Sequence, residues 1–296
     1  MKPRCLLLCI LIGLTSIAES QTDSVNTRKR VALVAGIGVA GYAGSMVFLN
    51  DLWYKDFPRS SFHFFNDNKE WQQMDKVGHG VSAFWTSSYG IDAMRWTGIS
   101  DKKAILYGGL YGTFFLTTIE VLDGFSAGWG ASAGDLIANT AGSLLAVGQE
   151  LIWNEKRFQL KYSFHTSDFA QYRPDVLGKN FAQQLLKDYN GQSYWLSCNL
   201  KSWLPPESKF PDWLHIAFGY GASGMIGATD NVMPDGREFC FSRYRRYFLS
   251  VDVDPSRIKT NKRFLKLLFK SLSVIKIPAP ALELSRKRMH GHLLYY

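Results

Sequence analysis

The chain has 296 residues, of which 46% are hydrophobic, 15% aromatic and 20% charged. This composition excludes a disordered or fibrous protein and provides enough apolar side chains for one or two hydrophobic cores. The formal net charge of +9 is concentrated in residues 243–296, which hold 13 Lys and Arg against 3 Asp and Glu. The rest of the chain has 21 basic and 22 acidic residues, so the net charge does not mark the whole protein as nucleic-acid-binding.

The first 20 residues have the pattern of a secretory signal peptide. Lys2 and Arg4 precede an apolar run over residues 5–17, and residues 18–20 place small side chains at the −3 and −1 positions of a cleavage site. The run is too short to cross a membrane as a helix. We therefore expect a signal peptide at 1–20, cleaved before Gln21.

Cleavage would leave two of the four cysteines in the mature chain. Cys5 and Cys9 belong to the signal, and Cys9 follows leucines rather than the small residues of a lipobox. Cys198 and Cys240 remain, without the spacing of a metal site. In an oxidising compartment they either pair or stay as free thiols.

The mature chain divides into a helical half and a mixed half. Residues 21–30 form a polar lead, 31–153 a helical bundle with a polar site, and 154–296 a mixed α/β region with a basic C-terminal segment. Uncharged runs predict the helices of the bundle. These are expected at 31–50, 75–97, 102–121 and 132–153.

The first of these helices is the strongest candidate for a membrane span. Residues 31–50 carry no charge and are long enough to cross a bilayer. Gly36, Ala40 and Gly44 share one face, with the spacing that lets helices approach closely. A buried core helix is the alternative. The uncharged runs of the other three helices are shorter and fit both a membrane bundle with polar ends and a soluble bundle.

The second half contains extended segments. A helix near 178–189 should stop at Asn190-Gly191, a strong turn signal. Extended stretches are expected at 192–200, 213–225, 245–254 and 273–284. The predicted fold class is mainly α, a four-helix, membrane-like bundle followed by a smaller mixed α/β C-terminal region with antiparallel strands.

Polar and charged residues gather at the ends of three expected helices. They open the second helix, close the third and open the fourth. In chain order they are Asp75, Lys76 and His79, then Glu120 and Asp123, then Asp135 and Asn139. Helices that run up and down with short connections alternate their ends between two sides of a bundle. The three groups should therefore meet on one side, with the aromatic loop at 51–74 available to cover them.

Glu120 is the most informative residue of this cluster. A carboxylate in the last turn of a helix opposes the helix dipole, whereas Asp75 and Asp135 in first turns are favoured by it. Both of these aspartates also fit ordinary capping patterns. Glu120 ends an uncharged run and so needs a cation, a hydrogen-bond donor, a metal ion or water nearby.

Three interpretations of the cluster are open. It is a self-satisfied polar network, a metal or small-ligand site without chemistry, or a hydrolytic or transfer site. In the third case a divalent metal would be the cofactor and a carboxylate the general base. The candidate catalytic and metal-binding residues are Asp75, His79, Glu120 and Asp135. A ligand-binding set adds Lys76, Asp123 and Asn139.

The order of these motifs resembles a known group of proteins. The motifs are Asp75-Lys76-x-x-His79, Glu120-x-x-Asp123-Gly124 and Asp135-x-x-x-Asn139-x-x-Gly142. Over residues 45–155 they resemble the YfiM-like family of predicted periplasmic lipoproteins and are similar to VanZ-like membrane proteins. Residues 187–192 resemble the longer, Bacteroidota-type members. The resemblance implies an envelope protein of a Gram-negative bacterium and no established reaction.

The sidedness of the bundle is open. A cleaved signal and four spanning helices would place 154–296 in the periplasm and the polar site on the cytoplasmic side. The positive-inside rule places the more basic ends of helices in the cytoplasm. In this bundle the basic residues lie at the ends away from the polar site, so the rule places the site on the periplasmic side. These basic residues are Arg28, Lys29, Arg30, Arg95, Lys102, Lys103, Lys156 and Arg157. We expect a membrane-associated protein with a periplasmic C-terminal region.

The expected function is an envelope protein with a polar pocket at one end of a helical bundle, with a structural or ligand-binding role. One alternative is a metal-dependent hydrolase or transferase that acts on a lipid or cell-wall precursor. Another is a scaffold that recruits envelope partners through its C-terminal half.

The basic segment 257–270 predicts contact with membrane lipid. As a helix, 262–270 would separate Arg263, Lys266 and Lys270 from its leucines, a pattern typical of segments on an anionic membrane surface. A solvated basic surface is the alternative. Nucleic acid is not expected as a partner, because an envelope protein with a signal peptide rarely meets it.

Overall fold

The computed structural model describes residues 27–55, 57–233 and 235–296. The expected signal peptide at 1–20, with Cys5 and Cys9, lies outside the described residues. The chain forms two compact units. The helical unit comprises Met1–Asp67 and Ser82–Lys156, and the sheet unit comprises Asn68–Val81 and Arg157–Tyr296.

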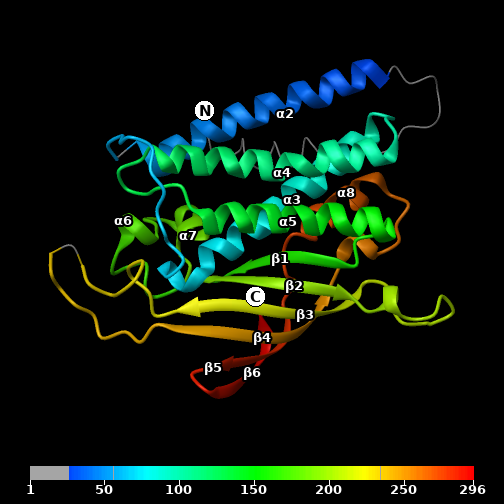
Figure 1. Cartoon of the computed structure of the whole chain (residues 1–296). Helices are drawn as coiled ribbons and strands as arrows, with labels where there is room; N and C mark the ends of the chain where they lie inside the picture. The colour runs from blue at the N-terminus through cyan, green and yellow to red at the C-terminus, as the bar shows by residue number, and fades with distance from the viewer. Residues whose placement is uncertain (1–26, 56, 234) are drawn as a thin grey trace. The chain divides into compact units, whose positions relative to one another are not determined.

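The helical unit is built from long helices, as the uncharged runs predicted (Figure 1). These are α2 (Thr27–Leu49), continued by the short π-helix η2 (Asn50–Tyr54), most of α3 (Met74–Trp96), α4 (Asp101–Gly124) and α5 (Ala133–Trp153). The four expected helices are confirmed. α5 begins where the Ser132 hydroxyl accepts the Asp135 N–H at 3.2 Å and ends at Asn154 in the left-handed conformation.

Small residues let α3, α4 and α5 approach closely. A Cβ added at Gly90 would lie 2.3 Å from the Gly108 carbonyl oxygen, so the backbones of α3 and α4 touch there. The Ser87 hydroxyl donates to the Gly109 carbonyl at 2.6 Å and lies 2.9 Å from the Ser143 hydroxyl on α5. Close backbone approach combined with hydroxyl hydrogen bonds is typical of helices that associate within a membrane.

Among the described residues, α2 and α4 are long and apolar enough to cross a membrane. α2 is almost entirely exposed, whereas 33% of the apolar window of α4 is buried. α2 contacts α4 through Tyr42, whose ring centroid lies 6.0 Å from those of Phe114 and Phe115. Tyr111 of α4 donates a hydrogen bond to the Gly38 carbonyl at 3.0 Å. The membrane-like nature of the bundle stays a prediction.

The small-residue face of α2 contacts no other helix at its glycines within the described residues. A Cβ added at Gly36 or Gly44 would have no atom within 4 Å. α2 is held to α4 by Tyr42 and by the hydrogen bond from Tyr111 instead, so the use of this face stays a prediction. Val34 is the buried residue of α2, so a fully buried core helix is not found either.

The sheet unit contains a six-stranded sheet in the order β1-β2-β3-β4-β5-β6, with every neighbouring pair antiparallel. Its strands are β1 (Phe158–Phe164), β2 (Gln192–Asn199), β3 (Leu214–Ser223), β4 (Tyr244–Val253), β5 (Ala279–Ser285) and β6 (Arg288–Tyr295). Its helices are the start of α3, α6 (Pro174–Leu177), α7 (Phe181–Lys187) and α8 (Arg263–Leu272). Cys198 and Cys240 are free thiols.

The fold class needs a correction. The stretches at 192–200, 213–225 and 245–254 are confirmed as strands, but only the second part of 273–284 is a strand. β1 and β6 were not expected, and the helix near 178–189 is shorter. With seven α-helices among the described residues and one six-stranded sheet, the protein is mixed α/β rather than mainly α, and its C-terminal region is not a small appendage.

The sheet carries polar side chains on its buried face. Lys161 of β1 and Asp252 of β4 are fully buried, and their Nζ and Oδ2 atoms lie 2.6 Å apart. The Ser197 hydroxyl donates to the same Oδ2 at 2.6 Å. The free edge of β1 bonds to the chain just before β5, since Tyr162 N–H donates to Val274 O at 2.9 Å. The sheet therefore curls around an interior that holds paired charges beside the apolar cluster of Trp195, Phe248 and Tyr295.

Candidate functional site

The expected site residues of the sheet unit lie at the start of α3. Asp75 Oδ1 is 3.9 Å from His79 Nε2, which confirms the expected i, i+4 pair. Asp75 Oδ2 is 4.0 Å from Lys76 Nζ. The hydroxyl of Tyr189 also donates to Asp75 Oδ1. Asp75 thus has one hydroxyl donor and two basic groups around it.

A strained segment leads into α3. Residues 71–73 all have positive φ angles, of 46°, 53° and 66°. Such a conformation costs a non-glycine residue about 1–3 kcal/mol and persists where the surroundings hold it, often at functional sites. Here the Tyr220 hydroxyl donates to the Gln72 carbonyl, and the Trp71 N–H donates to the Ala228 carbonyl at 2.7 Å. The sheet unit therefore fixes the backbone that presents the start of α3.

A buried turn positions Tyr189. Asp188 is fully buried and accepts hydrogen bonds from the Ser167 hydroxyl at 2.5 Å and the Asn190 side chain at 2.8 Å. The Asn190 side chain also pairs with the backbone of Met225 through two bonds of 2.8 Å. Burial raises the pKa of Asp188, although these hydrogen bonds oppose the shift. These hydrogen bonds fix the turn and so hold the Tyr189 hydroxyl beside Asp75.

A second tyrosine packs against the same helical turn. A Cβ added at Gly78 would lie 2.6 Å from the Tyr194 hydroxyl oxygen, so a glycine is needed for this approach. The Tyr194 hydroxyl donates to Gln192 Oε1 at 2.7 Å. Burial, and to a lesser degree the charge of Asp75, raises the pKa of Tyr194. Tyr194 is therefore a neutral donor at physiological pH.

The expected site residues of the helical unit surround the start of α5. Ser132 donates its backbone N–H to Glu120 Oε2 at 3.0 Å and its hydroxyl to Asp67 Oδ1 at 2.6 Å. The side chains of Glu120, Asp135 and Asn139 are 2%, 3% and 0% exposed. Glu120, at the end of an apolar helix, thus has the hydrogen-bond donor that its position required.

Asp123 lies beside a tyrosine from the end of α2. The Tyr54 hydroxyl donates to Asp123 Oδ1 at 2.7 Å. Burial, followed by the negative charges of Asp123 and Glu120, raises the pKa of Tyr54. Both carboxylates of α4 therefore lie close enough to Tyr54 to disfavour its ionised form.

The aromatic loop pairs with the connection between α4 and α5. His63 N–H donates to the Gly124 carbonyl at 2.9 Å, and the His63 ring nitrogen Nε2 lies 2.7 Å from the Trp129 carbonyl. A Cβ added at Gly128 would lie 2.5 Å from the ring of Phe57. Glycines in this connection therefore make room for aromatic rings, in addition to allowing the turn that the sequence predicted.

The structure thus brings the expected residues together in two groups, one in each unit. Asp75 and His79 form one group, and Glu120, Asp123, Asp135 and Asn139 belong to the other. The meeting of the two groups stays a prediction. Sequence reasoning missed several supporting residues, namely Tyr54, Asp67, Asp188, Tyr189, Asn190 and Tyr194. The run from Lys187 to Gln192, noted for its resemblance alone, contains three of them.

Glu120→Ala is expected to lower the free energy of unfolding by roughly 1–3 kcal/mol, because the buried Ser132 N–H would lose its acceptor. Glu207→Ala, in an exposed loop, is the control and should change little. Denaturant unfolding of the two purified variants measures the difference. Equal unfolding free energies would show that this hydrogen bond does not stabilise the start of α5.

Comparison with known protein families gives one match. Residues 63–149, from the aromatic loop to α5, match a family described as "predicted periplasmic lipoprotein (DUF2279)". The searches of curated proteins and of solved structures gave no match. The family description supports a location in the cell envelope and the periplasm, as expected from the signal peptide and the motifs. The finer resemblances to YfiM-like and VanZ-like proteins stay predictions.

Proposed function

We propose that the protein is a membrane-associated protein of the cell envelope that binds a divalent cation at the polar helix ends. The burial of the Glu120 and Asp135 carboxylates, 2% and 3% exposed beside apolar helices, carries the proposal. Buried carboxylates are costly unless they are hydrogen-bonded, paired or coordinate a metal. A bound cation would give the protein a structural or ligand-binding role.

Where the two groups meet as the sequence predicts, Asp75 and His79 would complete the set of ligands. A helix pair at i, i+4 presents both side chains on one face, and the distance of 3.9 Å between Oδ1 and Nε2 suits two ligands of one ion. Carboxylates with one imidazole suit a borderline or hard cation such as Zn²⁺ or Mn²⁺. Tyr189, which donates to Asp75, would orient the carboxylate from outside the ligand set.

Metal content of the purified chain tests the proposal. The wild-type protein, prepared without chelator, is expected to hold close to one divalent ion, and Asp75→Ala and Asp135→Ala should each lose it. Asp235→Ala, at an exposed position, is the matched control. Added metal at 100 times its Kd should stabilise the wild type by about 2.7 kcal/mol. Wild-type protein without metal and without such stabilisation would overturn the cation site.

Loss of metal from one variant alone would indicate a site confined to one unit. The alternatives of a hydrolase or transferase and of a scaffold stay predictions. The hydrolase would require the same bound ion, so the metal measurement bears on it as well.

We further propose that α8 contacts anionic head groups, as the sequence predicted for 257–270. α8 has no buried residue, and Phe264 is 71% exposed. Arg263 and Lys266 are exposed on the same short helix. A helix with exposed apolar and basic side chains binds at a lipid interface, where each basic residue contributes about 1 kcal/mol.

A fluorophore on Phe264→Cys tests this contact in the full chain reconstituted into vesicles. With anionic lipid at low salt its emission is expected to shift to the blue, and the shift should vanish at high salt because salt screens surface charges. Replacing Lys262, Arg263, Lys266 and Lys270 by Gln should abolish it. An equal shift in neutral vesicles, or none in either, would reject the electrostatic contact.

A further inference from the structure

The exposed face of the sheet is apolar over several adjacent strands. Its members are Phe218 on β3, Leu249 and Val251 on β4, Leu282 and Leu284 on β5, and Met289 on β6. We call these six residues the outward face. Their exposed fractions run from 41% for Leu249 to 71% for Met289. Contiguous apolar surface of this kind marks a site of interaction with protein or lipid.

The opposite face of the same strands is buried and carries paired charges beside an apolar cluster that includes Trp195, Phe248 and Tyr295. Arg246 of β4 and Glu283 of β5 pair at 2.8 Å, and His292 of β6 lies 2.9 Å from the same Glu283 oxygen. The fully buried Lys161 and Asp252 continue this interior. A sheet in water places its apolar residues inward, whereas strands in lipid alternate apolar-out and polar-in. An apolar outward face over an interior that includes paired charges is the combination found in strands that face lipid.

Basic residues flank the outward face at the β5–β6 turn. Arg286, Lys287 and Arg288 are exposed there. Anionic phospholipid head groups complement such a rim. A second copy of this chain would instead place its own basic residues against this rim, where the like charges would repel each other.

We propose that the outward face lies among the acyl chains of one membrane leaflet. By the strand register the six residues cover five positions along β4, from Val251 to Tyr247, which pairs with Leu284. This is roughly 13–17 Å at about 3.3 Å per residue, against about 30 Å for a whole hydrocarbon layer. The face is thus tall enough for one leaflet and too short to span. This proposal rests on the membrane association proposed above and adds the surface of the sheet unit that enters the lipid.

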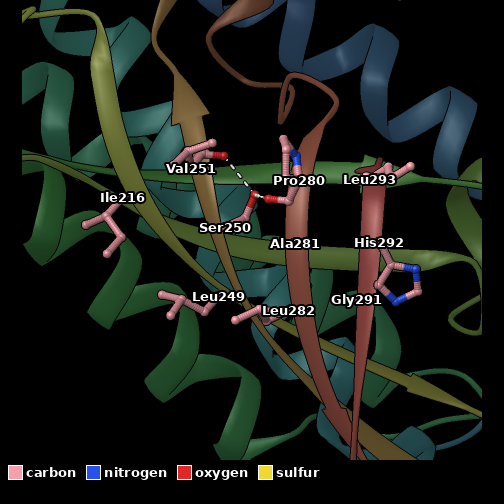
Figure 2. A pocket seen from close by; sticks show the side chains of 10 residues that line it. All are labelled: Ile216, Leu249, Ser250, Val251, Pro280, Ala281, Leu282, Gly291, His292 and Leu293. Atoms are coloured by element: carbon pink, nitrogen blue, oxygen red, sulfur yellow. Dashed lines mark hydrogen bonds between the residues drawn. The ribbon is translucent and has the colours of Figure 1, made fainter.

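A shallow depression on this side of the sheet offers room for an acyl chain. It has a volume of about 500 Å³ and is lined mainly by apolar side chains from β3 to β6. Figure 2 shows the side chains of Leu249 and Leu282 side by side, with Pro280 and Leu293 toward the other end of the lining. The Ser250 hydroxyl donates a hydrogen bond to the Pro280 carbonyl at 2.8 Å, so it does not add an unsatisfied polar group to the depression.

Depth-dependent fluorescence quenching tests the proposal in the full chain. In a background in which the four cysteines are replaced by serine, Leu249→Cys and Leu282→Cys are labelled with bimane and reconstituted with lipids that carry a doxyl quencher on the acyl chain. Val39→Cys, on the exposed apolar surface of α2, is the positive control, and Glu207→Cys, in an exposed loop, is the negative control. Quenching at both sheet positions is expected to exceed that at Glu207 several-fold.

The outcomes separate the two proposals. Quenching at Val39 but not at Leu249 and Leu282 would overturn the outward face as a lipid surface while leaving membrane association intact. Absence of quenching at all three positions would overturn both. Cross-linking of Leu249→Cys between two chains, without quenching, would assign the face to a second copy and overturn the lipid proposal.

Discussion

Lys161→Met is expected to lower the free energy of unfolding by about 3–5 kcal/mol, because it leaves the buried Asp252 carboxylate without its closest cation. The loss also removes the hydrogen bond from Lys161 to the Val253 carbonyl at 2.9 Å. Denaturant unfolding of the full chain measures the effect. Lys209→Met, at an exposed position, is the control and should stay within about 0.5 kcal/mol of wild type.

The double variant Lys161→Met, Asp252→Asn distinguishes a broken ion pair from a packing defect. The amide introduced by Asp252→Asn would be neutral, and its oxygen could still accept the hydrogen bond from Ser197. The double variant is therefore expected to be more stable than Lys161→Met alone. A double variant that loses the sum of both single effects would show that the two charges do not stabilise each other.

Gly108→Ala is expected to cost about 3 kcal/mol, the upper end of the range for overpacking. A Cβ at this position would lie within 2.4 Å of three backbone atoms of Gly90 and Ile91, and backbone cannot yield as a side chain can. Gly148→Ala on α5 is the matched control, because its Cβ would meet nothing within 4 Å. It should gain about 0.5–1 kcal/mol from helix propensity. A similar cost for both variants would contradict the close contact of α3 and α4.

The helices were predictable from the sequence because their signals are local. Uncharged runs and the capping residue Ser132 are visible without knowledge of the fold. β1 alternates with a period of two, from Phe158 to Phe164, but Lys161 in its centre is typical of a surface residue. Its burial depends on Asp252, which lies on β4 far along the chain. No local pattern reports such a partner.

The candidate site was likewise predictable where its signals are local. Asp75 and His79 share a helix face by spacing alone, and Glu120 was identified by its unfavourable place in the helix dipole. Tyr189 and Tyr194 could not be found in this way, because they follow Asp75 by more than 100 residues and act through the folded sheet unit. The left-handed backbone before α3 had no signal either, since Trp and Gln rarely adopt it.

The sheet unit is assembled from two separate stretches of chain, Asn68–Val81 and Arg157–Tyr296. During synthesis the first stretch leaves the ribosome well before its partners Tyr189 and Tyr220, with most of the helical unit in between. β5 and β6 are made last, yet the Tyr295 ring packs 4.5 Å from Phe248 and 5.8 Å from Trp195 within the core. Such long-range contacts slow folding. The strained start of α3 must therefore wait until the chain has been made beyond Ala228 before it acquires the contacts that hold it.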